Sequence, residues 1–339
     1  MILKNKTLRQ ALMASIITFA IALSSLKALP AQPLVGAGAV LANNLYQRYI
    51  SAYQQETGNE VRYDSMDGRK ALDKFVEGAV DFAISDLPPT REEVSQIQQK
   101  EGMFILPIAG LPIAVIYNLR EESAPVSLSR ENLVKIFTGK VSSWNQVDPN
   151  LPTTDIKVVV RSDRSSANYT LTNYLSAITN GKIETKLFPD WGFDVFSSVT
   201  DASRVTGEVR RTDGAIGYVG AIMARGSSLP IAKIQNKSGE YLLPGLPNVI
   251  KALNNHRFNE DFTLSSEESP EGYPLTTPIF ILLRKQYSSP EKAQDIKEMI
   301  DWILTKGQEL NQEVQLARIP EETAQRAIQV AKTNISASQ

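Results

Sequence analysis

Apolar runs of strand length alternate with helical patterns along most of the chain. Runs such as Glu60–Tyr63 and Val80–Ile84 are each followed or preceded by segments whose apolar residues recur about one helical turn apart. Strands that alternate with helices build mainly parallel sheets covered by helices. The pattern therefore predicts an α/β fold.

Two long apolar segments, Phe104–Tyr117 and Tyr273–Leu283, interrupt this alternation and predict extended strands. The block between them has strands of its own, and the helices after it are expected to return to the first part of the chain. Two crossings around an inserted block indicate two lobes joined by a hinge. We expect residues 32–117 and 273–339 to form the first lobe and residues 118–272 the second.

The N-terminus has the pattern of an export signal. Three basic residues within the first nine positions precede an apolar run from Ala11 to Leu26. This run is shorter than the roughly 20 residues that a membrane-spanning helix prefers. We therefore predict a signal peptide over residues 1–31, cleaved after Ala28 or Ala31. The alternative is an uncleaved anchor that keeps the protein at the inner membrane.

The composition excludes several classes of function. Cysteine is absent, His256 is the only histidine, and the formal net charge is −1. The absence of cysteine excludes disulfides and thiolate metal sites. A single histidine disfavours multi-histidine metal sites and a Ser-His-Asp triad. No basic block is dense enough to follow a nucleic-acid backbone. We expect a binding protein without cofactor, metal or catalytic residue, and a surface or loop position for His256.

Small or polar residues mark the first of three strand-to-helix junctions, where open α/β sheets place ligands. In the segment Gly36–Leu41, exposed backbone N–H groups at a helix start can receive an anion. The same glycines fit equally well a structural turn that permits close packing.

The second junction is Ser85-Asp86, which follows the buried strand ending at Ile84. A carboxylate in an anion site accepts a hydrogen bond from a protonated ligand oxygen, which a fully ionised oxyanion cannot supply. The competing interpretation is that Asp86 only caps the next helix.

The third junction, Arg161–Asn168, carries the strongest local signal. The arginine side chain is a planar cationic fork that matches two oxyanion oxygens, and the serines and helix-start amides add neutral donors. The alternative is a capped polar loop with a solvated arginine.

A family resemblance rests on motifs in these junctions and between them. The chain resembles, from about Leu34 to Ile335, the periplasmic phosphate-binding subunit of the high-affinity phosphate ABC importer. Seven motifs occur in the same order: Gly36-Ala37-Gly38-Ala39, Gln55-Glu56-Thr57-Gly58-Asn59, Val80-Asp81-Phe82 with Ser85-Asp86, Ile136-Phe137-Thr138-Gly139-Lys140 with Trp144, Arg161-Ser162-Asp163 with Ser165, Gly214-Ala215-Ile216-Gly217-Tyr218-Val219, and Tyr273-Pro274.

The resemblance implies a two-lobed periplasmic-binding-protein fold of type II that closes on dehydrated phosphate. Asp86 would accept the ligand proton and Arg161 would pair with ligand oxygens. It also implies a periplasmic, monomeric protein that hands inorganic phosphate to the membrane permease of an ABC importer. The full set of ligand-binding residues expected in this way is Ala39, Val40, Leu41, Gly68, Asp86, Arg161, Ser165, Ser166 and Ala167.

Three positions depart from the family pattern. Val40, Gly68 and Ala167 stand where the family usually has hydroxyl side chains, and each lost hydrogen bond weakens binding by roughly 1 kcal/mol or more. Arg69 or Lys70 would either replace these donors or face solvent. Three alternatives therefore stay open: a protein of this fold tuned to another oxyanion, a membrane-tethered phosphate-sensing paralogue, and, less favoured, a secreted phosphatase.

Overall fold

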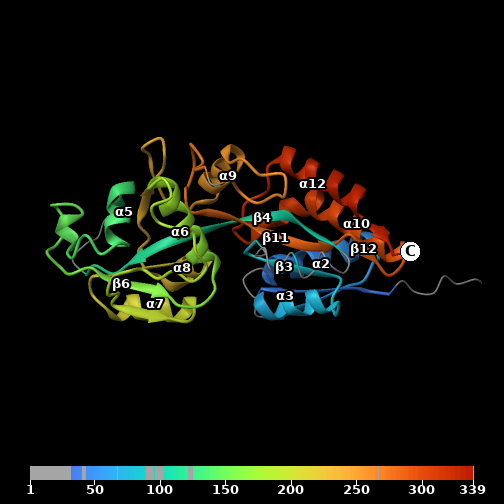
Figure 1. Ribbon diagram of the computed structural model, residues 1–339, viewed down its shortest axis with the longest axis horizontal. Helices are drawn as coiled ribbons and strands as arrows, with labels where there is room; N and C mark the ends of the chain where they lie inside the picture. Colours follow the sequence, from blue (N-terminus) through green and yellow to red (C-terminus); the bar gives the residue numbers. More distant parts are fainter. Residues whose placement is uncertain are drawn as a thin grey trace, which may run out of the picture. The chain divides into compact units, whose positions relative to one another are not determined.

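Eight strands form the large sheet of the computed structural model, which describes residues 32–39, 43–66, 68–88, 95, 102–120, 125–265 and 267–338 (Figure 1). All of these strands lie within the unit Leu34–Gln339. In order across the sheet they are β2 (Val61–Met66), β1 (Leu34–Ala39), β3 (Phe82–Ser85), β11 (Thr276–Arg284), β4 (Met103–Tyr117), β8 (Ala215–Gly220), β6 (Lys157–Arg161) and β7 (Ser197–Val199).

Helices and short strands complete the described part of the chain. A three-stranded sheet contains β10 (Tyr241–Leu242), β9 (Lys233–Gln235) and β5 (Ser127–Leu128), and a two-stranded sheet pairs β12 (Gln286–Tyr287) with β13 (Ser336–Ala337). The helices are α2 (Asn43–Thr57), α3 (Gly68–Glu77), α5 (Arg130–Ile136), α6 (Ser166–Ile178), α7 (Ala202–Arg211), α8 (Ala221–Ser227), α9 (Leu246–Asn255), α10 (Pro290–Leu304), α11 (Leu310–Glu313) and α12 (Glu321–Asn334), with short 3₁₀ helices at Trp144–Gln146 and Lys306–Glu309.

The long strand β4 belongs to both halves of the sheet. Its residues Met103–Pro112 pair antiparallel with β11, and Ile113–Tyr117 pair antiparallel with β8. On one side β1 runs parallel to β2 and β3, and on the other β6 runs parallel to β7 and β8. The predicted α/β fold with its crossing strands is thus confirmed, but the sheets expected for the two lobes are halves of one continuous sheet that share β4. Figure 1 shows β4 and β11 side by side where they connect the two halves.

One extra residue, Ile108, is inserted into β4 between Pro107 and Ala109 in its pairing with β11. The carbonyl of Ile108 accepts hydrogen bonds from Nε2 of Gln308 at 2.9 Å and Nδ2 of Asn311 at 3.1 Å. Such a bulge reverses the side-chain alternation along the strand. The C-terminal segment thereby holds the strand that connects the lobes.

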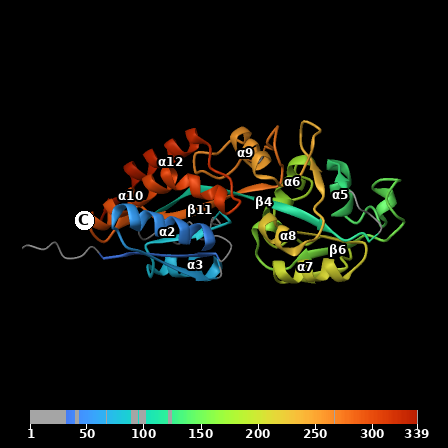
Figure 2. The same cartoon turned by 180° about the vertical axis from the view of Figure 1, so that it is seen from behind.

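Helices cover both faces of each half of the sheet (Figure 2). In the first half, α2, α10 and α12 pack with one set of strand side chains, and α3 packs with the opposite set. In the second half, α5 and α6 lie on one side and α7 and α8 on the other. The predicted helix positions Leu45, Tyr49 and Tyr53 are buried in α2, as expected from their spacing.

The glycine segment Gly36–Ala39 was predicted to form a turn, and this prediction is wrong. These residues continue strand β1 to its end at Ala39. A Cβ atom on Gly36 would overlap the ring of Phe82, and one on Gly38 would come within 2.7 Å of the Ile84 carbonyl oxygen. Both glycines are therefore needed for close packing of neighbouring strands. Of the alternative interpretation, a structural turn that permits close packing, only the close packing is correct.

Some predictions fall outside the described residues. They are the signal peptide over residues 1–31, the binding positions Val40 and Leu41, and the side chain of Arg69. Across the ranges that the structure describes, none of the helices has the length and apolar character needed to span a membrane.

Candidate functional site

A cavity of about 560 Å³ lies where the strand ends of the two halves of the sheet approach each other. Residues 44–87 line one side of it and residues 161–223 line the other. Its polar lining is concentrated at the end of β3 and in the loop from β6 to α6, as expected for a ligand site at the carboxyl ends of strands. The lining residues are Asn44, Gly68, Leu72, Ser85, Asp86, Leu87, Arg161, Asp163, Arg164, Ser165, Ser166, Ala167, Ala202, Gly220, Ile222 and Met223.

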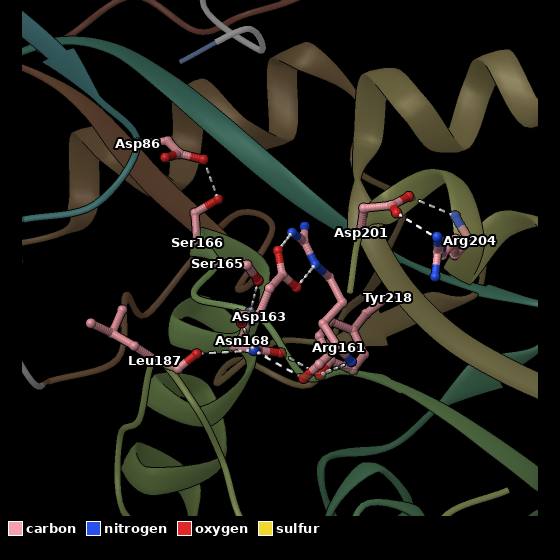
Figure 3. Close-up of polar contacts among 10 residues, drawn as sticks. All are labelled: Asp86, Arg161, Asp163, Ser165, Ser166, Asn168, Leu187, Asp201, Arg204 and Tyr218. Atoms are coloured by element: carbon pink, nitrogen blue, oxygen red, sulfur yellow. Dashed lines mark hydrogen bonds and ion pairs between the residues drawn. The ribbon is translucent and has the colours of Figure 1, made fainter. Parts of the chain in front are cut away.

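Arg161 is held in a fork-to-fork ion pair with Asp163 (Figure 3). Nε of Arg161 lies 2.8 Å from Oδ1 of Asp163, and the second nitrogen, Nη2, binds Oδ2. The arginine side chain is only 15% exposed. Because the carboxylate takes one edge of the guanidinium, the cation is oriented by its neighbour and its remaining N–H groups are available to a ligand.

Helix α6 begins at the cavity with Ser165 as its N-cap. The Ser165 hydroxyl accepts a 3.0 Å hydrogen bond from the backbone N–H of Asn168. The amides of Ser166 and Ala167, the first two helical residues, have no acceptor within the helix. These amides and the positive end of the helix dipole favour an anion at this point of the cavity.

The nearby start of α7 differs in this respect. Its N-cap Asp201 accepts a 2.9 Å hydrogen bond from the backbone N–H of Arg204, and its Oδ2 lies 3.2 Å from Nε of the same arginine. Figure 3 shows this carboxylate and its arginine beside the cavity loop. The α7 terminus is thus neutralised by its own aspartate, so α6 is the better place for a bound anion.

Asp86 follows β3 and lies next to the start of α6. Its Oδ2 accepts a 2.6 Å hydrogen bond from the hydroxyl of Ser166 (Figure 3). This contact joins residues 80 positions apart and brings the second and third predicted junctions to one place. A carboxylate and a helix start therefore face the same cavity.

A buried amide fixes the loop between β6 and α6. Asn168 is fully buried, and its Nδ2 lies 3.2, 2.9 and 3.0 Å from the carbonyl oxygens of Arg161, Asp163 and Leu187. The hydroxyl of Tyr218, on β8, donates to the amide oxygen of Asn168 at 2.5 Å and accepts from the backbone N–H of Arg161 at 3.3 Å. The position of Arg161 is thus set by its backbone as well as by its ion pair.

Among the described residues of the lining, the charged side chains balance one another: Asp86 and Asp163 oppose Arg161 and Arg164. Burial raises the pKa of the Tyr218 hydroxyl, so this group stays protonated and remains a hydrogen-bond donor. Burial, with a smaller contribution from the charge of Asp86, also raises the pKa of Tyr63 on β2. With the charges of these described residues balanced, the start of α6 adds positive potential through its helix dipole.

Six of the nine predicted site residues lie together around this cavity: Gly68, Asp86, Arg161, Ser165, Ser166 and Ala167. Of the other three, Ala39 ends β1, and Val40 and Leu41 lie outside the described residues. Lys70, one of the two suggested replacement donors, is exposed and is not part of the cavity lining.

The sequence interpretation missed the residues that hold the site in place. Asp163 and Asn168 lie inside the polar segment that was singled out, but nothing in their spacing distinguished them from loop residues. Tyr218 lies in an apolar strand, and nothing in the sequence around it indicated that its hydroxyl would hold the site by hydrogen bonds. The apolar lining by Ile222 and Met223 was also not predicted.

Residues 24–306 match the family model described as PBP superfamily domain. The chain is 31% identical to the phosphate-binding protein PstS of Pasteurella multocida, over 91% of this chain and 92% of that protein. It is 29% identical to the phosphate-binding protein PstS of Haemophilus influenzae, over 89% of this chain and 93% of that protein.

Solved structures show the same fold at lower sequence identity. A high-affinity periplasmic phosphate-binding protein, PfluDING, solved with bound phosphate, superposes with a TM-score of 0.71 at 17% identity and covers 87% of this chain and 92% of its own. A phosphate-binding protein from Stenotrophomonas maltophilia gives a TM-score of 0.67 at 17% identity, with 91% and 96% covered. With its two crossing strands, its cavity and these matches, the chain belongs to the PBP superfamily and, within it, to the PstS family of phosphate-binding proteins.

Proposed function

We propose that this protein binds inorganic phosphate in the cavity between its two lobes and delivers it to the membrane permease of an ABC importer. The observation that carries the proposal is the convergence of three features on one cavity: the oriented guanidinium of Arg161, the open start of α6 and the carboxylate of Asp86. The names of the relatives agree with this ligand.

Each feature has a separate task in binding. Arg161 pairs with ligand oxygens through the N–H groups that Asp163 leaves open. The amides of Ser166 and Ala167 donate to further oxygens, and Asp86 accepts a proton that the ligand carries. No covalent step is needed, since closure of the lobes is the only mechanical event.

The cellular context follows from the same proposal. The protein works as a periplasmic monomer after removal of its export signal, with the lobes divided at 117/118 and 272/273. A membrane-tethered phosphate-sensing protein is the alternative if the signal is retained. Fractionation combined with mass analysis of the N-terminus separates the two, and a pull-down of the permease with and without phosphate tests delivery.

Calorimetry on the exported protein tests the ligand. We expect one phosphate per chain, with binding abolished by Arg161→Ala and by Asp86→Ala. Unaltered binding in both variants would refute the site. Activity of the pure protein on a phosphate monoester would instead reveal an enzyme.

A second candidate is a related oxyanion as the natural ligand. The apolar residues of the lining, including Leu72, Ile222 and Met223, and the departures at Val40, Gly68 and Ala167 favour it. A competition panel of phosphate, arsenate, sulfate and phosphonates distinguishes the candidates. Binding of sulfate without phosphate would replace the first proposal by the second.

A further inference from the structure

The hydroxyl of Ser166 has an unusual place in the cavity, because it is already engaged as a donor. It lies 2.6 Å from Oδ2 of Asp86, and an ionised carboxylate can only accept. A serine hydroxyl has one hydrogen and two lone pairs. Once that hydrogen points to Asp86, Ser166 offers a ligand an acceptor and no donor.

The start of α6 therefore offers two kinds of partner to a ligand. Asp86 and the Ser166 hydroxyl oxygen are neighbouring acceptors, which suit ligand O–H groups. The Arg161 guanidinium and the backbone amides of Ser166 and Ala167 are donors, which suit unprotonated oxygens. Dihydrogenphosphate has two oxygens of each kind, whereas hydrogenphosphate has one O–H group and would leave one acceptor unsatisfied.

The charge of the lining supports the same match. Among the described residues of the lining, Asp86 and Asp163 balance Arg161 and Arg164, and Tyr63, which lies outside the lining, stays neutral. The start of α6 adds only about half a positive charge. A monoanion fits this potential better than a dianion.

We infer that Ser166 is a specificity-determining residue that accepts a hydrogen bond from the ligand, so that the cavity selects the monoanionic, dihydrogen form of phosphate. This inference rests on the proposed function. Asp86 accepts a hydrogen bond from one ligand O–H group, and the Ser166 oxygen accepts a hydrogen bond from a second.

Phosphate titrations of the exported protein at pH 6 and pH 8 test the inference. The second ionisation of phosphate falls between these values, so selection of the monoanion requires the affinity for total phosphate to be about sevenfold higher at pH 6. We expect Ser166→Ala to reduce this ratio to below about twofold and Ser166→Thr, which keeps the hydroxyl, to restore it.

Two controls make the result specific. Ser238 is exposed and lies outside the cavity lining, where its hydroxyl donates to Oδ1 of Asn236 at 2.8 Å, so Ser238→Ala should leave the pH ratio unchanged. Hypophosphite is a monoanion without an O–H group and should bind far more weakly than phosphate at pH 6.

The outcomes separate the two proposals. Equal loss of affinity at both pH values in Ser166→Ala, or hypophosphite binding as tight as phosphate, would overturn the role of Ser166 while leaving phosphate binding intact. Failure of the unmodified protein to bind phosphate at either pH would overturn the proposed function itself.

Discussion

The hydroxyl of Tyr218 donates a 2.5 Å hydrogen bond to Oδ1 of Asn168, and this contact sets the orientation of a fully buried amide. With its oxygen engaged, Asn168 directs Nδ2 to three backbone carbonyls of the loop that carries Arg161. Through Tyr218 and Asn168, strand β8 thus helps to position Arg161, which lies on the neighbouring strand β6.

Truncation of this amide should destabilise the protein. Asn168→Ala leaves the Tyr218 hydroxyl and the buried carbonyls without their partner, and we expect a loss of about 3 kcal/mol in the free energy of unfolding. Urea denaturation at equilibrium measures it. Asn255→Ala, which removes one exposed hydrogen bond to Lys251, is the matched control and should change stability by less than about 0.5 kcal/mol. Similar losses in both variants would contradict the bracing role of Asn168.

The geometry of Arg161 should matter as well as its charge. Arg161→Lys keeps the cation but cannot hold Asp163 and a ligand through one planar fork, so we expect phosphate affinity to fall by about tenfold or more. Calorimetric titration checks this. The exposed Arg204 offers the control, since Arg204→Lys should alter affinity by less than about twofold. An Arg161→Lys protein with undiminished affinity would show that a point charge suffices.

Close strand packing at Gly38 gives a prediction about stability. In Gly38→Ala the added methyl group would overlap Tyr63 and Ile84, so neighbouring strands must separate, at a cost of about 1–3 kcal/mol. Gly226→Ala adds the same group at a helical position with open space around it and should be neutral or slightly stabilising. Thermal unfolding of the two variants compares them, and a destabilised Gly226→Ala with an unaffected Gly38→Ala would contradict the packing.

The single histidine predicts how stability responds to acid. His256 lies just after α9, in a loop position as expected, and is half-buried, with Nε2 3.1 Å from the Ser265 carbonyl oxygen. Burial lowers the pKa of His256, and this effect outweighs the hydrogen bonds to the Ser265 and Glu267 backbone, which raise it.

The sign of the effect follows from proton uptake. Below about pH 6.5 the unfolded state binds a proton at this histidine before the folded state does, so His256 reduces stability as the pH falls. Denaturant unfolding at pH 7 and pH 5.5 should show a smaller loss in His256→Gln than in the unmodified protein. An equal or larger loss in the variant would contradict the lowered pKa.

The buried Glu268 makes stability depend on pH in the opposite direction to His256. Desolvation raises the pKa of this carboxyl above its usual value, although the charges of Arg130 and Lys237 oppose the shift. The folded state therefore holds this proton more tightly, and the associated stability is lost as the pH rises through the raised pKa. Comparing His256→Gln with the unmodified protein cancels this contribution.

Elements with a long or regular pattern could be predicted from the sequence. The apolar length of β4 and β11, the one-turn spacing in α2 and the polar segment before α6 all depend on local rules of burial and capping. Because the carboxyl ends of strands meet at one edge, Asp86 and Arg161 could also be expected in one cavity.

Features that depend on distant contacts could not be predicted. Gly36 and Gly38 suggest a turn when they are considered alone, and only the neighbouring Phe82, Tyr63 and Ile84 show why a strand needs glycine there. The hydrogen bond from Ser166 to Asp86 joins two junctions that the sequence treats separately. The partners of Asn168 likewise come together only in the fold.

A crystal structure of the exported protein with phosphate would show directly whether this cavity is the phosphate site. We expect one phosphate in the cavity, with oxygens within hydrogen-bond distance of the Arg161 guanidinium and of the Ser166 and Ala167 amides, and with a protonated oxygen facing Asp86. Phosphate bound elsewhere on the chain, with Arg161 still paired only to Asp163, would contradict it.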